Sequence, residues 1–391
     1  MKYYIISGEA SGDLHGSNLV KELKKLDHSA NMRGWGGDLM QEQGVTLVKH
    51  FRDLAFMGFA EVLMNIRTIL KNIDFCKKDI LEFKPDVLIL IDYPGFNLRI
   101  AKFAHQHGIK VFYYISPSVW AWKESREKLI KAVVDKMFVI LPFEKAFYQK
   151  HNYQVDFVGH PLLDAMENQT KQFTSFEEFV TTNKLSGKPI IAILPGSRKQ
   201  EIAAMLPVMT SITEKFPDYE FIIAGAPSLP LSYYQEFTRD KSIKIIFNKT
   251  YEILHHAHSG LIKSGTSTLE AALLNVPQVV CYKANPISIW IGRRLVKIKF
   301  FSLVNLIMNE EVVKELLQEE MNETTLVEEL KKVTYDTPER KKLIFEYDKL
   351  KNMLGGLGAS KRLAELMYTY IQQNKFWKTP NSPSPLERGK G

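Results

Sequence analysis

The sequence has little cysteine and no long apolar run. Its two cysteines, Cys76 and Cys281, cannot build a disulfide framework, which fits a reducing compartment and predicts a cytoplasmic protein. Nowhere do about 18 apolar residues follow one another, and the apolar stretch at the start is too short for a signal peptide. We therefore expect no membrane-spanning helix, so any contact with a membrane is peripheral.

Acidic residues are in the minority, since 52 Lys and Arg against 44 Asp and Glu give a formal net charge of +8. This excess favours a polyanionic partner such as nucleic acid, an anionic lipid surface or a phosphorylated substrate. No sequence-reading nucleic-acid motif occurs, so no nucleic-acid partner is expected.

Motifs for two common enzyme classes are also missing. The segment GEASGDLHG (8–16) does not space its glycines as G-x-G-x-x-G, which disfavours a nicotinamide enzyme. No H-E-x-x-H or C-x-x-C accompanies the histidines near residue 256, so we expect no metal site.

Short apolar strands instead alternate with helical segments along most of the chain. Strands are expected at 2–7, 87–91, 110–115, 137–141, 190–194, 221–224, 244–247, 260–263 and 278–282. Continuous apolar runs are typical of parallel strands that are covered on both faces. The sequence therefore predicts an α/β protein with two tandem doubly wound, Rossmann-like domains. Such sheets bind ligands at the carboxyl ends of their strands, so we expect a cleft between two facing domains.

A polar stretch at about 167–188 separates the two halves. The predicted organisation is a first Rossmann-like domain at 1–168, a second at 186–345, C-terminal helices at 346–374 and a tail at 375–391. The tail is rich in proline and serine and is expected to be disordered.

An acidic residue ends one of the strands. The run LILIDYPGFNLRI (88–100) is apolar up to Asp92, and Pro94 and Gly95 turn the chain directly after it. Burial beside aromatic neighbours should raise the pKa of this carboxyl group. Asp92 is therefore a candidate general base for a sugar hydroxyl. The alternative is a carboxylate that caps its own turn.

Two turns of the second half are candidate phosphate sites. In LPGSRKQEI (194–202), Gly196 makes the turn, Ser197 can cap the next helix, and Arg198 has a fork that suits phosphate oxygens. The alternative is an ordinary helix cap with a solvated arginine.

The second turn, KSGTSTLE (263–270), offers backbone amides at a helix start, which could stabilise a diphosphate leaving group without a metal. Its small residues are Ser264, Gly265, Thr266 and Ser267. Glu270 could accept hydrogen bonds from a ribose diol, or it could close a capping box.

The polar loop at 8–16 is a further candidate. Glu9, Ser11 and Asp13 would form a polar floor of the cleft, and the alternative is a plain turn and helix cap.

Two segments have apolar or aromatic faces that suit a lipid. The segment 56–73 has more apolar side chains than one core-facing stripe requires, although a fully buried helix would look the same. Its candidate contacts are Phe56, Met57, Phe59, Val62, Leu63 and Ile66. The second segment places an aromatic and basic residues on one helical face: Trp290, Arg293, Arg294 and Lys297. This face fits an anionic membrane or an acyl-phosphate ligand, or it is an ordinary surface helix.

An ordered set of motifs resembles the lipid-A-disaccharide synthase family. The matching segments are GEASGD (8–13), LAFMGFAEVL (54–63), KPDVLILIDYPGFN (84–97), YYISPSVWAWKESR (113–126), ILPFEKAFY (140–148), FVGHPLLD (157–164), LPGSR (194–198), SGTSTLE (264–270) and SLVNLI (302–307). The resemblance runs from residue 3 to about 372.

The resemblance implies a GT-B inverting glycosyltransferase of lipid A and lipopolysaccharide biosynthesis for the Gram-negative outer membrane. It would transfer 2,3-diacylglucosamine from its UDP carrier to the 6-hydroxyl of 2,3-diacylglucosamine 1-phosphate, at the cytoplasmic face of the inner membrane and without a cofactor. Asp92 would be the essential base, and Glu9 and Ser11 would lie near the acceptor. Tyr282 and Asn305 would lie near the nucleotide. The domain at 1–168 would bind the acceptor, and the domain at 186–345 would bind the UDP-sugar.

The family's C-terminal helix packs on its first domain, and the resemblance leaves a homodimer open. The sequence departs from some relatives at Gly95, where they have a second acid, and at Lys263, where a small residue is common. Two alternatives remain, a UDP-sugar 2-epimerase of the same architecture and a non-catalytic lipid-binding protein.

Overall fold

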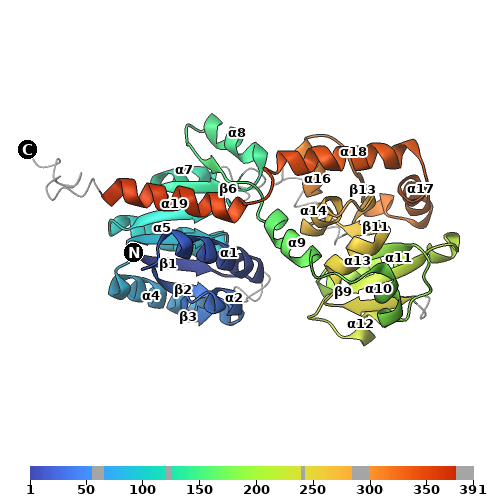
Figure 1. Cartoon of the computed structure of the whole chain (residues 1–391), viewed down its shortest axis with the longest axis horizontal. Coiled ribbons are helices and arrows are strands. Elements are labelled where there is room, and N and C mark those ends of the chain that lie inside the picture. The colour runs from blue at the N-terminus through green and yellow to red at the C-terminus, as the bar shows by residue number, and fades with distance from the viewer. Residues whose placement is uncertain (55–65, 118, 120–124, 239–242, 284–298, 376–391) are drawn as a thin grey trace, which may run out of the picture. The chain divides into compact units, whose positions relative to one another are not determined.

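The computed structural model describes residues 1–54, 66–117, 119, 125–238, 243–283 and 299–375 (Figure 1). The chain forms two compact units. Unit 1 comprises Met1–Pro161 together with the chain from Gly358 onward, and unit 2 comprises Leu162–Leu357. The fold of unit 1 therefore uses both ends of the described chain, whereas unit 2 is continuous.

The described part of unit 1 contains a parallel sheet of seven strands in the order β3-β2-β1-β4-β5-β6-β7. Its strands are β1 (Lys2–Ser7), β2 (Asn31–Gly36), β3 (Thr46–His50), β4 (Val87–Ile91), β5 (Lys110–Tyr114), β6 (Lys136–Val139) and β7 (Asp156–Phe157). Successive residues of β1 enter different cores, with Tyr3 and Ile5 in one and Tyr4 and Ile6 in the other. This alternation confirms that the sheet is covered on both faces.

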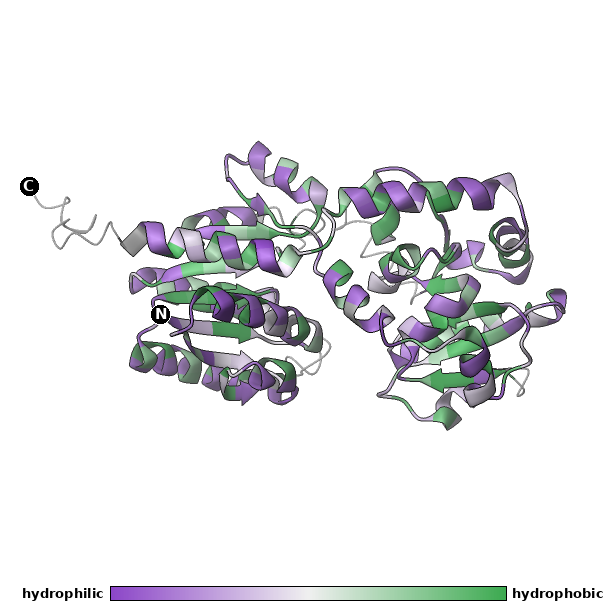
Figure 2. Ribbon diagram, viewed as in Figure 1, coloured by the Kyte–Doolittle hydropathy of each residue, from purple (hydrophilic) through white to green (hydrophobic). Residues whose placement is uncertain are grey.

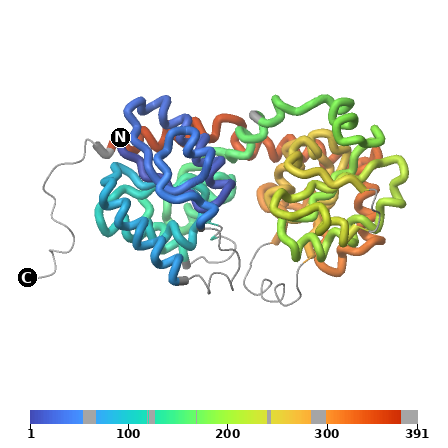
Figure 3. Tube along the Cα trace, turned by 90° about the horizontal axis from the view of Figure 1, so that it is seen from below, coloured from blue at the N-terminus to red at the C-terminus, as the bar shows by residue number. Residues whose placement is uncertain are grey.

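Helices cover each face of this sheet. They are α1 (Ala10–Leu26), α2 (Asp38–Glu42), α4 (Ile66–Phe83), α5 (Pro94–Gln106), α7 (Ser125–Val133), α8 (Pro142–Lys150) and α19 (Ala359–Lys375). The C-terminal helix α19 packs against α1, where Leu363 and Met367 join the same core as Leu19 and Leu23. Figure 3 shows this return of the chain, with the red helix beside the blue N-terminal segments. The expected packing of the C-terminal helix on the first domain is confirmed.

The described part of unit 2 contains a parallel sheet of six strands in the order β10-β9-β8-β11-β12-β13. Its strands are β8 (Ile190–Leu194), β9 (Glu220–Gly225), β10 (Lys244–Phe247), β11 (Ala257–Lys263), β12 (Gln278–Tyr282) and β13 (Lys314–Leu317). The described α-helices of unit 2 are α9 (Leu162–Thr170), α10 (Phe176–Asn183), α11 (Lys199–Thr210), α12 (Leu231–Gln235), α13 (Thr250–His256), α14 (Thr266–Leu273), α16 (Leu303–Met308), α17 (Glu323–Thr334) and α18 (Pro338–Met353). Figure 2 shows hydrophobic strands in this unit and helices that alternate between hydrophobic and hydrophilic residues.

The strand order of both sheets positions the candidate residues. The order of the strands reverses beside the first strand of each sheet. These topological switch points lie between β1 and β4 in unit 1 and between β8 and β11 in unit 2. Ligands bind at the carboxyl ends of the strands at such a reversal. Ser7 pairs with Ile91, so Glu9 and Asp92 both follow closely on that edge. Leu194 pairs with Ile262, which brings together the two turns of unit 2 that were predicted to bind phosphate.

Candidate functional site

Asp92 lies directly after β4 in a backbone conformation that non-glycine residues rarely adopt. Asp92 has φ 44° and Tyr93 has φ 49°, so two consecutive residues are left-handed. Such residues cost about 1–3 kcal/mol each and persist only where neighbours fix them. The Asp92 carbonyl oxygen accepts hydrogen bonds from the Tyr113 hydroxyl at 2.6 Å and the Asn97 side-chain amide at 2.7 Å. The Asp92 N–H donates to the Tyr114 carbonyl at 3.0 Å.

The Asp92 carboxyl group has the electrostatics of a proton acceptor. The pKa of this carboxyl group is raised to about 6. Burial is the largest cause and the charge of Glu9 adds to it, whereas a hydrogen bond from the Tyr93 backbone acts in the opposite direction. Among the described residues, no side chain donates a hydrogen bond to this carboxylate. A base whose pKa lies near neutral pH is efficient in proton transfer.

Glu9 and Ser11 lie at the start of α1 and are exposed. Glu9 is the N-cap residue of α1, yet its side chain makes no capping hydrogen bond. The ring of Tyr93 covers Gly8, where an added Cβ would lie 2.3 Å from the ring. Glycine is therefore required where this loop meets the Asp92 turn.

Asp13 does not contribute to the expected polar floor. It is buried, and its carboxylate accepts hydrogen bonds from the backbone N–H groups of Gly37 (2.8 Å), Leu39 (3.2 Å) and Met40 (3.1 Å). These groups belong to the start of α2, so the structural alternative is correct for this residue.

Unit 2 has a pocket of about 370 Å³ at the carboxyl edge of its sheet. Its lining comes mostly from residues that follow β8, β9 and β11: Leu194, Gly196, Ser197, Glu201, Ala224, Gly225, Ala226, Pro227, Thr250, Lys263, Gly265, Thr266 and Ser267. Gly196 has φ 106°, a conformation that favours glycine. The two predicted turns therefore line a single pocket.

Basic side chains accompany these turns. Lys263 Nζ lies 3.0 Å from Glu201 Oε1, and Arg198 Nη1 lies 3.5 Å from the same oxygen. The Ser197 N–H donates to Glu201 Oε2 at 3.3 Å. The Arg198 side chain is 71% exposed, so it is accessible to a ligand. The sequence prediction missed Glu201, whose position in the first turn of α11 suggests only a favourable helix charge.

Glu270 lies in α14 and is half-buried. It accepts a hydrogen bond from the Tyr251 hydroxyl at 2.9 Å, and burial raises the pKa of its carboxyl group. The sequence prediction missed Tyr251, because the pairing joins residues on separate helices. Glu270 is not among the residues that line the pocket.

Ser264 and Tyr282 contact the segment that precedes α16. The Ser264 hydroxyl donates to the Phe301 carbonyl at 2.8 Å. The Tyr282 ring stacks on the Phe301 ring, with centroids 6.0 Å apart. Both candidates therefore connect the sheet edge of unit 2 to residue 301.

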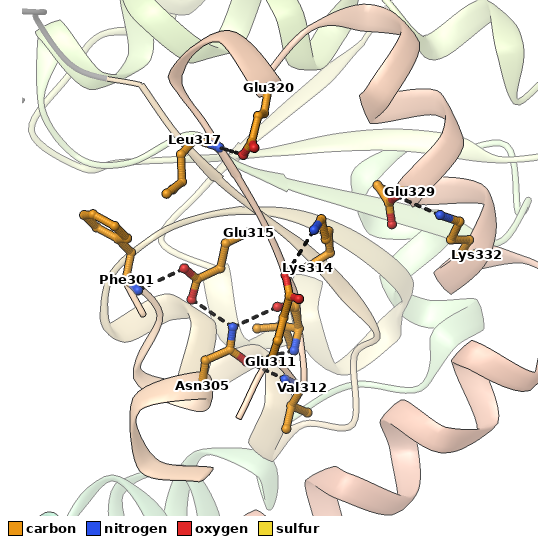
Figure 4. Close-up of polar contacts among 11 residues, drawn as sticks. Phe301, Asn305, Glu311, Val312, Lys314, Glu315, Leu317, Glu320, Glu329 and Lys332 are labelled. Atoms are coloured by element: carbon orange, nitrogen blue, oxygen red, sulfur yellow. Dashed lines mark hydrogen bonds and ion pairs between the residues drawn. The ribbon is translucent and has the colours of Figure 1, made fainter. Parts of the chain in front are cut away.

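Asn305 is fully buried and its side-chain amide is engaged by protein groups (Figure 4). It donates to the Val313 carbonyl at 2.8 Å and to Glu315 Oε1 at 2.9 Å. Its oxygen accepts from the N–H groups of Val312 at 2.8 Å and Val313 at 2.9 Å. Glu315 also accepts from the N–H groups of Phe301 (2.9 Å) and Ser302 (2.8 Å). The Asn305 amide thus holds the backbone at Val312 and Val313 in place. The sequence prediction missed its partner Glu315.

The candidate lipid contacts lie almost entirely outside the described residues. These are Phe56, Met57, Phe59, Val62, Leu63, Trp290, Arg293, Arg294 and Lys297. Ile66 begins α4. Within the described ranges, none of the helices has both the length and the apolar content needed to cross a membrane. No three His, Cys, Asp or Glu side chains in those ranges form a group that could hold a metal ion.

Comparison with known proteins relates the whole arrangement to one family. A family model described as lipid-A-disaccharide synthetase matches residues 3–364. The chain is 38% identical over 371 residues to the lipid-A-disaccharide synthase of Coxiella burnetii (strain Dugway 5J108-111), covering 94% of this chain and 98% of the relative. It is 35% identical over 369 residues to that of Geobacter sulfurreducens, covering 93% and 95%.

Solved structures share the fold at low sequence identity. A UDP-GlcNAc 2-epimerase from Neisseria meningitidis bound to UDP-GlcNAc aligns with a TM-score of 0.62 and 13% identity, over 96% of this chain and 100% of the other. The calicheamicin glycosyltransferase CalG4 aligns with a TM-score of 0.59 and 12% identity, over 95% and 98%. These similarities confirm the predicted two-sheet GT-B architecture.

Proposed function

The chain belongs to the lipid-A-disaccharide synthase family, and on that premise we propose that it transfers 2,3-diacylglucosamine from UDP-2,3-diacylglucosamine to the 6-hydroxyl of 2,3-diacylglucosamine 1-phosphate. The products are the β-1,6-linked disaccharide 1-phosphate and UDP. One observation carries the proposal: the chain combines a carboxylate whose pKa is raised by burial, at the switch point of unit 1, with a pocket at the switch point of unit 2 that is lined by glycines, small hydroxyl residues and Lys263.

Unit 2 binds the donor in this proposal. The backbone amides of Ser197 and of residues 265–267 would receive the diphosphate, with Arg198 as a charged partner. Glu270 would receive the ribose hydroxyls beside its Tyr251 partner. Hydrogen-bond donors aimed at the departing oxygen stabilise the charge that develops as the sugar–phosphate bond breaks. These groups supply positive potential without a metal ion, so we propose metal-independent transfer.

Unit 1 activates the acceptor. The Asp92 carboxylate would take the proton of the 6-hydroxyl while the hydroxyl oxygen attacks C1 of the donor sugar. The bond from C1 to the diphosphate breaks on the opposite face, so the configuration inverts and UDP leaves with the bonding electrons. Glu9 would keep the pKa of Asp92 high, and Ser11 would lie near the acceptor. Proton transfer of this kind contributes about 10²- to 10⁴-fold.

Because both proposed substrates carry acyl chains, the enzyme would meet them at a membrane surface. We propose peripheral binding at the cytoplasmic face of the inner membrane through the apolar residues of segment 56–73 and the predicted aromatic and basic face of Trp290, Arg293, Arg294 and Lys297.

A UDP-sugar 2-epimerase is the second candidate, because solved epimerases share the fold. The deciding assay mixes the purified full chain with UDP-diacylglucosamine and diacylglucosamine 1-phosphate, with and without detergent. We expect disaccharide and UDP in equal amounts. Conversion of UDP-GlcNAc to its 2-epimer without any disaccharide would establish the epimerase instead. Absence of both products would leave a lipid-binding protein.

A further inference from the structure

Glu201 is an acidic residue inside a pocket that otherwise suits anions. Its side chain is only 17% exposed, and its two oxygens accept the Ser197 N–H and lie near Lys263 and Arg198. A carboxylate therefore contacts one backbone donor and two cations. Phosphate oxygens use the same kinds of donor.

The turn is shaped around this carboxylate. A Cβ added at Gly196 would lie 2.5 Å from Glu201 Oε2, so the glycine leaves room for the acid as well as adopting its left-handed backbone. The Lys263 side chain is only 21% exposed, and the residue lines the pocket. Its partner among the described residues is Glu201.

We propose that Glu201 is an internal counter-anion, which holds Lys263 and Arg198 before the donor binds and releases them to the diphosphate. Lys263 then becomes a second cation for the diphosphate beside Arg198. The inference rests on the proposed donor site in unit 2. It adds that the chain limits its own affinity for UDP, because part of the positive charge is already neutralised. Weaker product binding favours release of UDP after transfer.

The first test measures UDP binding to the full-length chain by calorimetry. The Glu201→Gln variant keeps the size of the side chain and removes its charge, so we expect UDP to bind about two- to fivefold more tightly, the scale of a partly exposed ion pair. Lys263→Met should weaken UDP binding by roughly tenfold, as expected for a charge-assisted phosphate contact, and should reduce its salt dependence. Uridine, which lacks phosphate, should bind all variants equally.

The matched control is Glu323→Gln, which removes an acid from the first turn of α17 outside the pocket. This variant makes the same change in net charge and also removes an acidic side chain from the first turn of a helix. Its affinity for UDP should stay at the wild-type value. In the double variant Glu201→Gln/Lys263→Met, the gain from the first substitution should shrink because the released cation is gone.

Failure of this inference is distinguishable from failure of the proposed function. If the wild-type chain does not bind UDP, the donor site itself is wrong. If the wild-type chain binds UDP but Glu201→Gln leaves the affinity unchanged or weakens it, the counter-anion role is wrong. Unchanged binding by Lys263→Met would likewise overturn the role of Lys263 as a second cation.

Discussion

Asp92 combines a strained backbone with a side chain that is available for chemistry. Its backbone groups are held by Tyr113, Asn97 and Tyr114, so the turn does not depend on the carboxylate. The raised pKa means that the folded state holds the proton to a higher pH than the unfolded state does. The stability contribution of this group therefore falls as pH rises from 3.8 to about 6.

Replacement of Asp92 by asparagine tests this division of roles. We expect turnover to fall by about 10²-fold or more, because the amide cannot accept the proton. UDP affinity should be unchanged, and the melting temperature at pH 7 should be equal or higher, since a buried charge is removed. Initial rates, calorimetry and thermal unfolding measure the three quantities. Turnover within a factor of a few of wild type would reject Asp92 as the base.

The pH dependence of activity follows from the same carboxylate. The base must be unprotonated, so kcat/KM should rise with pH through an apparent pKa of about 6 and then level off. Glu9→Gln removes a like charge and should move this midpoint to lower pH. The pH–rate profiles of the wild type and of Glu9→Gln test this expectation. An unchanged midpoint in the variant would exclude the electrostatic coupling of Glu9 to Asp92.

At the scale of elements, the segment before α16 depends on β13. Glu315 of β13 accepts the N–H groups of Phe301 and Ser302, and Asn305 joins the same carboxylate (Figure 4). The Ser264 hydroxyl in turn donates a hydrogen bond to the carbonyl oxygen of Phe301. This chain of contacts links the turn after β11, which lines the pocket of unit 2, to β13, which does not line it.

Loss of the Asn305 amide should destabilise this element. Asn305→Ala leaves the buried N–H group of Val313 without its acceptor and removes the amide donor from the Val313 carbonyl and Glu315, so we expect the free energy of unfolding to fall by about 2–4 kcal/mol. The control is Glu320→Gln, where an exposed cap at Leu317 changes and little loss is expected. Urea denaturation measures both. Equal losses in the two variants would contradict the role of the buried amide.

The sequence predicted the elements whose signal is local. Central strands such as Val87–Ile91 are continuous apolar runs, and the turns after β8 and β11 contain glycine and small hydroxyl residues. It did not predict β2, β3, β7 and β13, because these strands are short, polar or glycine-containing. Glu201, Tyr251 and Glu315 were missed because their roles depend on partners that folding brings close.

At the scale of the whole molecule, unit 1 is completed by the far end of the chain. Leu363, Ala364, Met367 and Ile371 of α19 belong to the core that contains the buried face of α1. The described strands of unit 2 all lie in one continuous stretch of the chain. The stability of unit 1 is therefore sensitive to α19, whereas unit 2 has no such dependence.

Truncation of a buried α19 side chain should affect the two units differently. Met367→Ala should cost about 2–5 kcal/mol in unit 1, as for other buried large-to-small substitutions. Hydrogen exchange should accelerate in β1 and α1 and stay unchanged in β8 and β11. Met353→Ala, in which the methionine is 40% exposed, is the control and should change little. Equal acceleration in both units would mean that they unfold as one.

The split construction of unit 1 has a consequence for synthesis. A ribosome makes residues 1–161 first, and all of unit 2 follows before α19 emerges. At about 5–20 residues per second, the interval lasts on the order of ten seconds or more. During that time the surface of α1 that α19 covers has no packing partner from α19 in the nascent polypeptide. Unit 1 is therefore the first part of the chain to be synthesised and the last to be completed.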